Sequence, residues 1–280
     1  MAHLILVSFL WAFSFGLIKR HLVGLDSAFV TAARLGLALL IFLPFLRIRR
    51  VSGRTAAGLA ALGAVQFGVM YLAYIESFRY LQAYEAALFT ITTPILVTLF
   101  ADAFDRTLRL RALAAALLAV AGTACVMVKS ANLSVTFTGF ALVQLSNAAF
   151  AIGQVLYRRW RARSAAVRDR EVFGLLYAGG FVVALAAVLS RDVSVSLTAK
   201  QSWTLLYLGV LASGAGFFLW NVGATKVSAA TLAVMNNAKV PLAVVVALLF
   251  FGEAASVPWL VASLALLGGA VFVANPKQQV

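Results

Sequence analysis

Residues Ser228 to Ala274 read SAATLAVMNNAKVPLAVVVALLFFGEAASVPWLVASLALLGGAVFVA, and this stretch decides the class of fold. It holds two apolar runs joined by a short segment, and its charged residues are Lys239 and Glu253. About 20 apolar residues in a helix cross the hydrocarbon of a bilayer, and a helix satisfies its own backbone hydrogen bonds there. We therefore expect two membrane-spanning helices over this stretch.

The same composition continues through the whole chain of 280 residues. Apolar residues make up 63% and charged residues 11% of it, and the mean hydropathy is +0.98. A soluble domain is about 45–50% apolar and about 25% charged. These values exclude an ordinary soluble enzyme, a secreted disulfide scaffold and a disordered chain. The single cysteine, Cys125, cannot form an internal disulfide or a thiolate metal site.

Hydropathy divides the chain into ten expected spans with short turns between them. They cover residues 4–18, 27–46, 56–78, 83–104, 108–128, 135–157, 172–189, 203–224, 228–251 and 258–274. We therefore expect an all-α membrane protein with ten transmembrane helices and almost no water-soluble part. We expect no metal and no cofactor.

The basic residues predict the orientation in the membrane. Arginines concentrate in loops 47–54, 106–111 and 158–170, which lie on one side if the ten spans alternate. Cytoplasmic loops carry the excess of Lys and Arg, so we expect this side and both termini to be cytoplasmic. The net charge of +14 then belongs to loops at a membrane surface, and we expect no nucleic-acid partner.

The chain also looks doubled. LWAFSFGLIKR ends in Lys19-Arg20, and AAFAIGQVLYRR ends in Arg158-Arg159; two further matching segments end at Pro94 and Pro241. Each half holds five spans, and an odd number inserts the second copy upside down. We expect two inverted five-helix repeats, residues 1–130 and 131–280, with the substrate bound between them near the mid-plane.

These residues resemble the EamA-type branch of the drug/metabolite transporter superfamily over nearly the whole chain. The first half carries the resemblance in Trp11, Phe15, Lys19 and Arg34. The second half carries it in LYLGVLASGAGFFLWNVGATKVSAA and in the closing block with Pro241, Gly252-Glu253 and Gly268-Gly269. The first half departs from the closing pattern after Pro94, where ADAFDRTLRL has Asp102 and Asp105 but no Gly-Glu pair.

The resemblance implies the superfamily fold and secondary transport by alternating access through a central cavity. It is closest to YddG-like exporters, which implies export of aromatic and other neutral amino acids across a bacterial inner membrane. The implied partners are a small-molecule substrate, an amino acid, and the lipid bilayer. No obligate protein partner is expected.

The two matched prolines mark the expected centre of the transport path. Each proline lacks an N–H and clashes with the carbonyl four residues earlier, which frees the carbonyls of Thr90 and Asn237 near mid-span. A free carbonyl in hydrocarbon costs several kcal/mol unless it finds a partner or lines a wet cavity. We expect a helix kink at Pro94 and at Pro241; the alternative is a simple packing bend.

Polar and aromatic side chains within the spans are the candidates for substrate binding. They are Lys239, Asn237, Asn236, Thr90, Gln144, Asn147, Trp11 and Tyr74. The Lys239 ammonium could hold a substrate carboxylate, or it could form a structural ion pair with Glu85. The amides and hydroxyls could instead join helices, and the aromatic rings could simply pack.

Two acidic residues, Glu85 and Glu76, are candidates for ion coupling. Arg34 lies in the second expected span, where it could snorkel or pair with Glu76 or Glu85.

Other functions remain open. A carrier for a nucleoside, a sugar derivative or a drug is one, although Lys239 favours an anionic group. A non-transporting scaffold or a channel is another, although a channel should show a continuous polar stripe. The sequence contains no HExxH, Gly-x-Ser-x-Gly or phosphate-loop motif, and we do not expect an enzyme.

Overall fold

The computed structural model describes residues 1–22, 24–81, 89–127, 137–164, 166–193, 195–250 and 257–274, and every element in those ranges is helical. The first half contains α1 (Ala2–His21), α2 (Ser27–Phe42), η1 (Leu43–Phe45), η2 (Ile48–Arg50), α3 (Gly53–Gly63), η3 (Ala64–Val69), α4 (Met70–Ser77), α6 (Thr93–Asp105) and α7 (Leu110–Met127). The second contains α8 (Phe137–Ala162), α9 (Asp169–Leu189), α10 (Ala199–Tyr207), η5 (Leu208–Ala215), α11 (Gly216–Ala224), α12 (Ala229–Phe250) and α13 (Val257–Ala274).

These helices follow the expected spans to within a few residues at most ends. Within the described residues, five helical segments are long and apolar enough to cross a membrane: Ser27–Phe45, Gly53–Ser77, Phe137–Ala162, Asp169–Leu189 and Ala199–Ala224. Shorter apolar helices cover Ala2–Ser14, Leu110–Gly122 and Pro258–Ala274. The all-helical membrane architecture agrees with the sequence analysis, and the count of ten spans stays a prediction.

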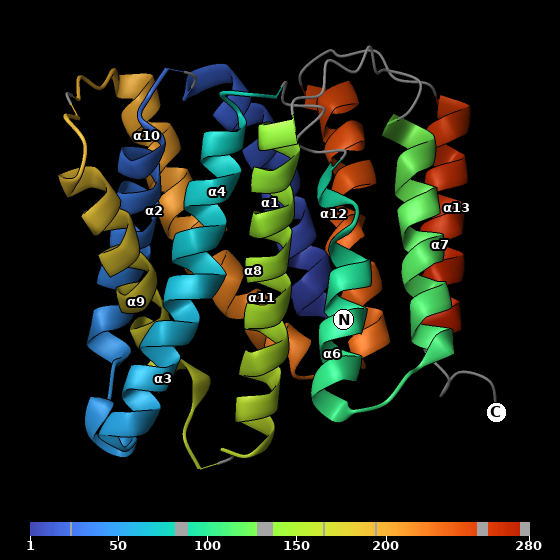
Figure 1. The fold of residues 1–280 in the computed structure, drawn as a ribbon. Helices are drawn as coiled ribbons and strands as arrows, with labels where there is room; N and C mark the ends of the chain where they lie inside the picture. Colours follow the sequence, from blue (N-terminus) through green and yellow to red (C-terminus); the bar gives the residue numbers. More distant parts are fainter. Residues whose placement is uncertain are drawn as a thin grey trace.

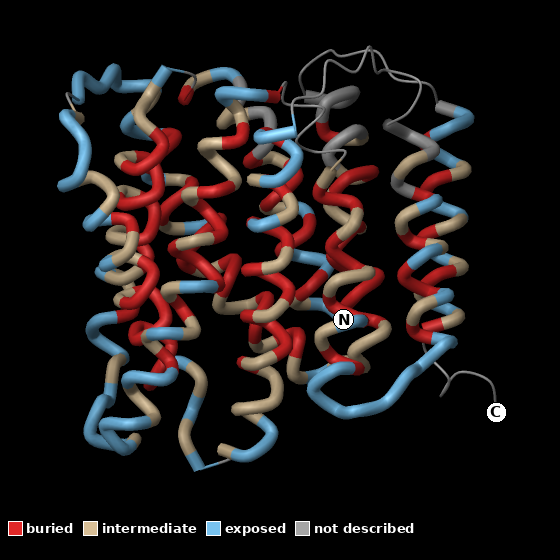
Figure 2. The backbone as a smooth tube through the Cα atoms, in the orientation of Figure 1, coloured by how far each residue is buried: buried red, intermediate tan, exposed pale blue. Residues whose placement is uncertain are grey.

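The helices form one bundle with its long axes roughly parallel (Figure 1). Helices α7 and α13 pack together at one edge, and α2, α3 and α9 pack together at the other. Between them lie α1, α8, α11 and α12, and the buried backbone concentrates in the middle of the bundle while the turns at its ends are exposed (Figure 2). The outer helix faces expose apolar side chains such as Leu40, Leu117, Val182 and Phe272, as a lipid-facing surface requires.

Two of the long helical segments contain a π-helical stretch in their middle. Segment η3 joins α3 to α4, and η5 joins α10 to α11, in the third and eighth expected spans. A π-helical turn widens the helix and shifts its backbone hydrogen bonds, and such turns are frequent at functional sites. The carbonyls of η5 accept hydrogen bonds from side chains on other helices, as described below.

The expected kink at Pro94 is a break in the helix. Residues 91 and 92 form a turn, and α6 begins at Thr93 with Pro94 in its first turn, where the missing N–H costs nothing. Pro241, by contrast, lies inside the continuous helix α12. The two matched prolines therefore act differently on their helices.

Acidic residues at the end of α6 fix its connection to α7. The buried Asp102 accepts from the backbone N–H and the guanidinium of Arg109, each at 2.9 Å. Asp105 binds Arg109 at 2.6 Å and also pairs with Arg159 of α8. These contacts give a local structural role to the two aspartates that replace the Gly-Glu pair in the first half.

Helices α3 and α9 approach so closely that glycine is required at their contact. A Cβ atom on Gly63 would lie 1.9 Å from the Leu176 carbonyl oxygen, and one on Gly179 would lie 1.8 Å from the Ala60 carbonyl oxygen. Small residues at such a crossing let two backbones pack directly in a membrane.

We predict that Gly179→Ala destabilises the protein by about 1–3 kcal/mol, because the added methyl group must push the two backbones apart. Gly58 is the matched control, since a Cβ there meets no atom within 4 Å and the residue lies in the same helix pair. Thermal unfolding in detergent should show a lower midpoint for Gly179→Ala and an unchanged or higher one for Gly58→Ala. Equal midpoints would contradict this close helix approach.

Candidate functional site

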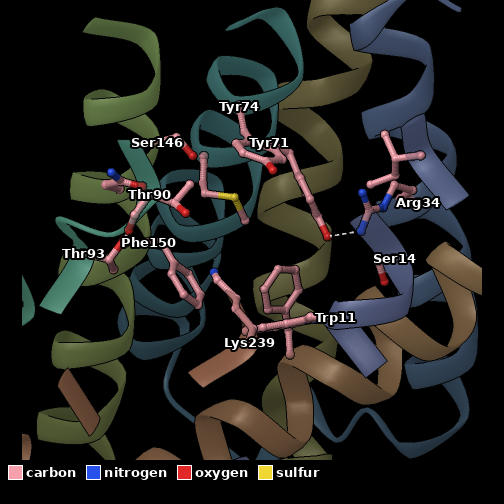
Figure 3. A pocket seen from close by; sticks show the side chains of 14 residues that line it. Trp11, Ser14, Arg34, Tyr71, Tyr74, Thr90, Thr93, Ser146, Phe150 and Lys239 are labelled. Atoms are coloured by element: carbon pink, nitrogen blue, oxygen red, sulfur yellow. Dashed lines mark hydrogen bonds between the residues drawn. The ribbon is translucent and has the colours of Figure 1, made fainter. Parts of the chain in front are cut away.

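A cavity lies in the middle of the bundle, among α1, α2, α4, α8, α11, α12 and the segment before α6 (Figure 3). It is lined by Trp11, Ser14, Ile18, Arg34, Met70, Tyr71, Tyr74, Thr90, Thr93, Ser146, Asn147, Phe150, Phe217 and Lys239. Seven of these fourteen residues are apolar or aromatic and seven are polar or charged, and small-molecule sites likewise combine apolar surface with polar groups. The described lining includes two cations and no carboxylate.

Aromatic rings in mutual contact form one wall of this cavity. The ring centroid of Phe217 lies 5.2 Å from that of Trp11, 5.6 Å from that of Tyr71 and 5.8 Å from that of Phe150. Trp220 lies behind Trp11 at 4.8 Å. Aromatic pairs at these separations stabilise each other beyond their buried area, so the wall is a firm surface for a flat apolar group.

The π-helical segment η5 holds this wall in place. The Trp11 indole N–H donates to the Ala212 carbonyl at 2.9 Å, and the Tyr177 hydroxyl lies 2.9 Å from the Ser213 carbonyl oxygen and 2.5 Å from that of Gly214. The Trp11 N–H is therefore already used. What Trp11 offers to a bound molecule is the face of its ring.

Lys239 enters the cavity from α12, beside the rings of Trp11 and Phe150 (Figure 3). Its Nζ lies 5.4 Å from the Trp11 centroid and 5.9 Å from the Phe150 centroid. Within the described part of the chain it has neither a hydrogen bond nor an ion pair, and Glu85, its expected alternative partner, lies outside the described residues. Aromatic faces attract a cation but do not neutralise it.

Arg34 reaches the same cavity from α2. Its Nη2 donates to the Tyr71 hydroxyl at 2.5 Å and its Nε donates to the Ser213 hydroxyl at 3.2 Å. Its guanidinium carbon also lies 4.2 Å from the Tyr71 ring centroid. Neither the expected snorkelling nor the expected pairing with Glu76 describes it, because the side chain is 3% exposed and its partners among the described residues are neutral. Glu85, the other expected partner, lies outside the described residues.

The helix break before Pro94 is stabilised by side chains on neighbouring helices. The Phe89 carbonyl accepts from Asn147 at 2.8 Å and from Gln144 at 3.2 Å. The Thr90 carbonyl, which Pro94 frees, accepts from the Thr93 hydroxyl at 2.6 Å. These bonds place the amides of α8 beside the break.

The same break also contacts the segment around the second proline. The Ile91 carbonyl accepts from the Asn237 amide at 3.0 Å, so α12 supplies a donor to the broken helix of the first half. Asn237 is 1% exposed and is not among the residues that line the cavity.

Asn236 lies in a separate buried network. The Gln154 side-chain oxygen accepts from the Trp220 indole at 3.0 Å and from the Asn236 amide at 3.3 Å, and the Gln154 amide donates back to Asn236 at 3.3 Å. All three side chains are fully buried. This network joins α8, α11 and α12 behind the aromatic wall.

The structure therefore separates the eight expected substrate-binding residues into two groups. Those that line the cavity are Lys239, Thr90, Asn147, Trp11 and Tyr74, and those that do not are Asn237, Asn236 and Gln144. Sequence reasoning did not single out Phe150 and Phe217 for the site, because nothing distinguishes them from the other phenylalanines until the helices are packed.

Of the two acidic candidates for ion coupling, Glu76 is described and is not among the residues that line the cavity. Glu76 binds Ser27 at 2.7 Å and Arg79 at 2.8 Å near the C-terminal end of α4, and Arg191 lies 3.6 Å away. Glu85 falls outside the described residues. Among the described residues no group of His, Cys, Asp and Glu could hold a metal ion.

A second hollow lies at the C-terminal end of α8. It is lined by Ala101, Asp105, Val155, Arg158, Arg159, Arg161, Ala162 and Thr225. Two of its arginines are already paired, Arg159 with Asp105 and Arg161 with Asp169. We take the central cavity as the candidate site, because it lies at mid-depth and its cations face it without a carboxylate partner in the described chain.

Comparison with known sequences gives two kinds of match. The sequence profile described as the EamA-like transporter family matches residues 1–128 and again residues 137–275. The chain is 43% identical to a probable biotin transporter of Pseudomonas aeruginosa, over 98% of this chain and 96% of that one. It is 42% identical to a biotin transporter of Escherichia coli K12, over 86% of this chain and 81% of that one.

A comparison with solved structures supports the architecture. One chain, described only as "Crystal structure of protein", superposes with a TM-score of 0.80 over 99% of this chain and 97% of the other. Its sequence is 20% identical, so this likeness bears on the fold alone.

We predict that Gln154→Leu destabilises the protein by about 1–3 kcal/mol, because the Trp220 indole N–H then remains buried without an acceptor. The Asn236 side chain also loses both of its bonds to Gln154 and keeps its bond to the Leu232 carbonyl at 2.8 Å. The control is Ser8→Ala: Ser8 is equally buried, but its hydroxyl donates only to the Leu4 carbonyl of its own helix. Unfolding midpoints in detergent should separate the two variants. A Gln154→Leu protein as stable as Ser8→Ala would contradict a supporting role for this network.

Proposed function

The chain belongs to the EamA-like transporter family, and from this premise we propose that it carries biotin across the membrane by alternating access through the central cavity. The names of its full-length relatives support biotin as the solute. The observation that carries the proposal is chemical: the described lining joins an aromatic wall to two cations, with no carboxylate among them.

Biotin matches that lining group by group. It is a monocarboxylate at neutral pH, with a flexible aliphatic chain and a compact fused-ring system that bears a ureido carbonyl. The carboxylate requires a cation, and the Lys239 ammonium has only aromatic faces beside it in the described chain, with no hydrogen bond or ion pair. The ring system requires apolar surface, which Trp11 and Phe217 provide.

The cavity is less suited to the amino acids that the family resemblance implied. An amino acid carries an ammonium group as well as a carboxylate, and the ammonium would enter a cavity that already holds Arg34 and Lys239. Like charges at close range in a low-dielectric interior repel strongly. The same argument disfavours a cationic drug, and a neutral nucleoside or sugar derivative would leave both cations uncompensated.

The proposed mechanism keeps the two-repeat organisation of the sequence analysis. The family profile matches the chain twice, and this supports two inverted five-helix halves, residues 1–130 and 131–280, that rock about the site. We further propose a bacterial inner-membrane location with both termini cytoplasmic. Two expectations from the sequence stay predictions: that transport runs in the direction of export, and that ions couple through Glu76 or Glu85.

The experiment is counterflow of labelled biotin into liposomes that contain the purified protein. We expect excess unlabelled biotin inside the liposomes to drive uptake of the labelled biotin. Excess phenylalanine or tryptophan inside the liposomes should leave the uptake of labelled biotin unchanged. Counterflow of an amino acid without biotin would restore the amino-acid prediction. Passage of unrelated solutes without counterflow would indicate a channel, and no movement of any solute by folded protein would indicate a scaffold.

We predict that Lys239→Met raises the biotin concentration for half-maximal counterflow by about 10- to 100-fold, because a charge-assisted hydrogen bond contributes about 1.5–3 kcal/mol. Lys226→Met removes the same charge at the exposed turn after α11 and serves as the control. Unchanged biotin counterflow in a folded Lys239→Met protein would remove the proposed carboxylate role.

A further inference from the structure

We propose that the substrate is held at two ends, with its carboxylate on Lys239 and a neutral carbonyl oxygen on Arg34, so that Arg34 determines which carboxylates are accepted. This inference rests on the proposed function and assigns a binding role to a residue outside the expected site. For biotin the carbonyl is that of the ureido ring.

Arg34 has the properties of a preformed ligand-binding group. It lines the cavity, it is 3% exposed, and the described chain places no carboxylate within ion-pair distance of it. A guanidinium has five N–H donors, and the hydrogen bonds to Ser213 and Tyr71 use Nε and Nη2. Donors remain for a bound acceptor. Burying a charged side chain inside a membrane bundle costs free energy, so a charged residue kept there is by default a functional one.

The contacts of Arg34 also fix its direction. The Tyr71 hydroxyl and the Ser213 hydroxyl lie 3.0 Å apart and bind the guanidinium from α4 and η5 respectively. The Tyr71 ring lies against the guanidinium face. A planar donor group held on one edge and one face presents its remaining edge in a defined direction.

Lys239 lies at the other end of the aromatic wall. Its ammonium contacts the rings of Trp11 and Phe150, whereas Arg34 contacts Tyr71. The Phe217 ring connects the two ends of the wall, because it packs on Trp11, which lies beside Lys239, and on Tyr71, which lies beside Arg34. Figure 3 shows the two cations reaching the cavity from different helices, with the aromatic side chains between them.

The chemistry of the two cations assigns the two ends of the substrate. The Lys239 ammonium is a compact charge with three donors and no polar partner in the described chain, so it benefits most from a full negative charge. The Arg34 charge is delocalised and already contacts two hydroxyls and a ring. A neutral carbonyl, which needs a donor but brings no charge, suits Arg34 better.

This arrangement makes two substrate features necessary together. An acid without the distant carbonyl leaves Arg34 without an acceptor, and an amide of biotin leaves Lys239 without an anion. A site with buried donors discriminates strongly against analogues that lack the matching acceptor, because those donors then remain unpaired. Flat apolar surface between the two ends accepts the ring system without adding polar specificity.

The experiment is a crossover of two variants against two analogues in biotin counterflow, measured as inhibition by each analogue. Biotinamide replaces the carboxylate with a neutral group, and 2-thiobiotin replaces the ureido oxygen with sulfur, a weak acceptor that leaves the ring neutral. We expect the unmodified protein to bind each analogue about 10- to 100-fold more weakly than biotin. Lys239→Met should lose the discrimination against biotinamide alone, and Arg34→Gln should lose the discrimination against 2-thiobiotin alone.

Because Arg34→Gln also disturbs Tyr71 and Ser213, two further measurements accompany it. Unfolding midpoints in detergent report whether each variant is folded, and Arg34→Lys keeps the charge while losing the planar donor edge. We expect Arg34→Lys to discriminate poorly against 2-thiobiotin and normally against biotinamide. If Arg34→Gln does not fold, the Arg34→Lys result alone decides whether Arg34 binds the ureido carbonyl.

Each result has a defined reading. The reversed crossover, with biotinamide discrimination lost on changing Arg34, would overturn the assignment of the two ends. Biotin counterflow with unchanged discrimination in both Arg34 variants would overturn this inference and leave the proposed function standing. Absence of biotin counterflow in the unmodified protein would overturn the proposed function, and this inference with it.

Discussion

A backbone carbonyl that leaves the helical pattern inside a bilayer must receive a donor from another part of the protein, and the centre of this bundle is arranged around that constraint. The break before Pro94 and the π-helical segment η5 free several carbonyls at mid-depth. Asn147, Thr93 and Asn237 supply donors to the break, and the Trp11 and Tyr177 side chains supply donors to η5. The donors come from five different helices, so satisfying the backbone also fixes how those helices pack.

The same constraint sorts the polar side chains into two populations. Amides and hydroxyls near the irregular backbone are largely occupied by it, and the Gln154 network occupies another set behind the aromatic wall. The cations are different: in the described chain, Arg34 has only neutral partners and Lys239 has only aromatic faces beside it. A group that the described fold does not neutralise is the natural contact for a charged solute. The positive charge of the cavity therefore comes from Arg34 and Lys239, the polar side chains that the irregular backbone does not occupy.

This division also relates the site to its proposed solute. The aromatic wall is rigid because its rings contact one another and because η5 anchors Trp11, so it provides a preorganised apolar surface. Cations at its two ends add selectivity for an acid with a distant acceptor. A carrier must also release its solute, and a site of a few charge-assisted contacts on an apolar wall can bind selectively without holding its ligand too tightly.

The sequence by itself determined the all-helical membrane class, the helix positions to within a few residues, and the family. These depend on hydropathy summed over some 20 residues and on motifs along the chain, which are local quantities. It also identified Lys239, because a charge at mid-span is conspicuous in one dimension. Only the tertiary structure decided that Asn236, Asn237 and Gln144 serve neighbouring side chains and backbone, that Phe217 joins the wall, and that Arg34 faces the cavity beside Tyr71 and Ser213. The physical reason is that an amide, a ring or a guanidinium in an apolar helix can satisfy a distant backbone group, pack, or face a solute, and which of these it does depends on partners far away in the chain.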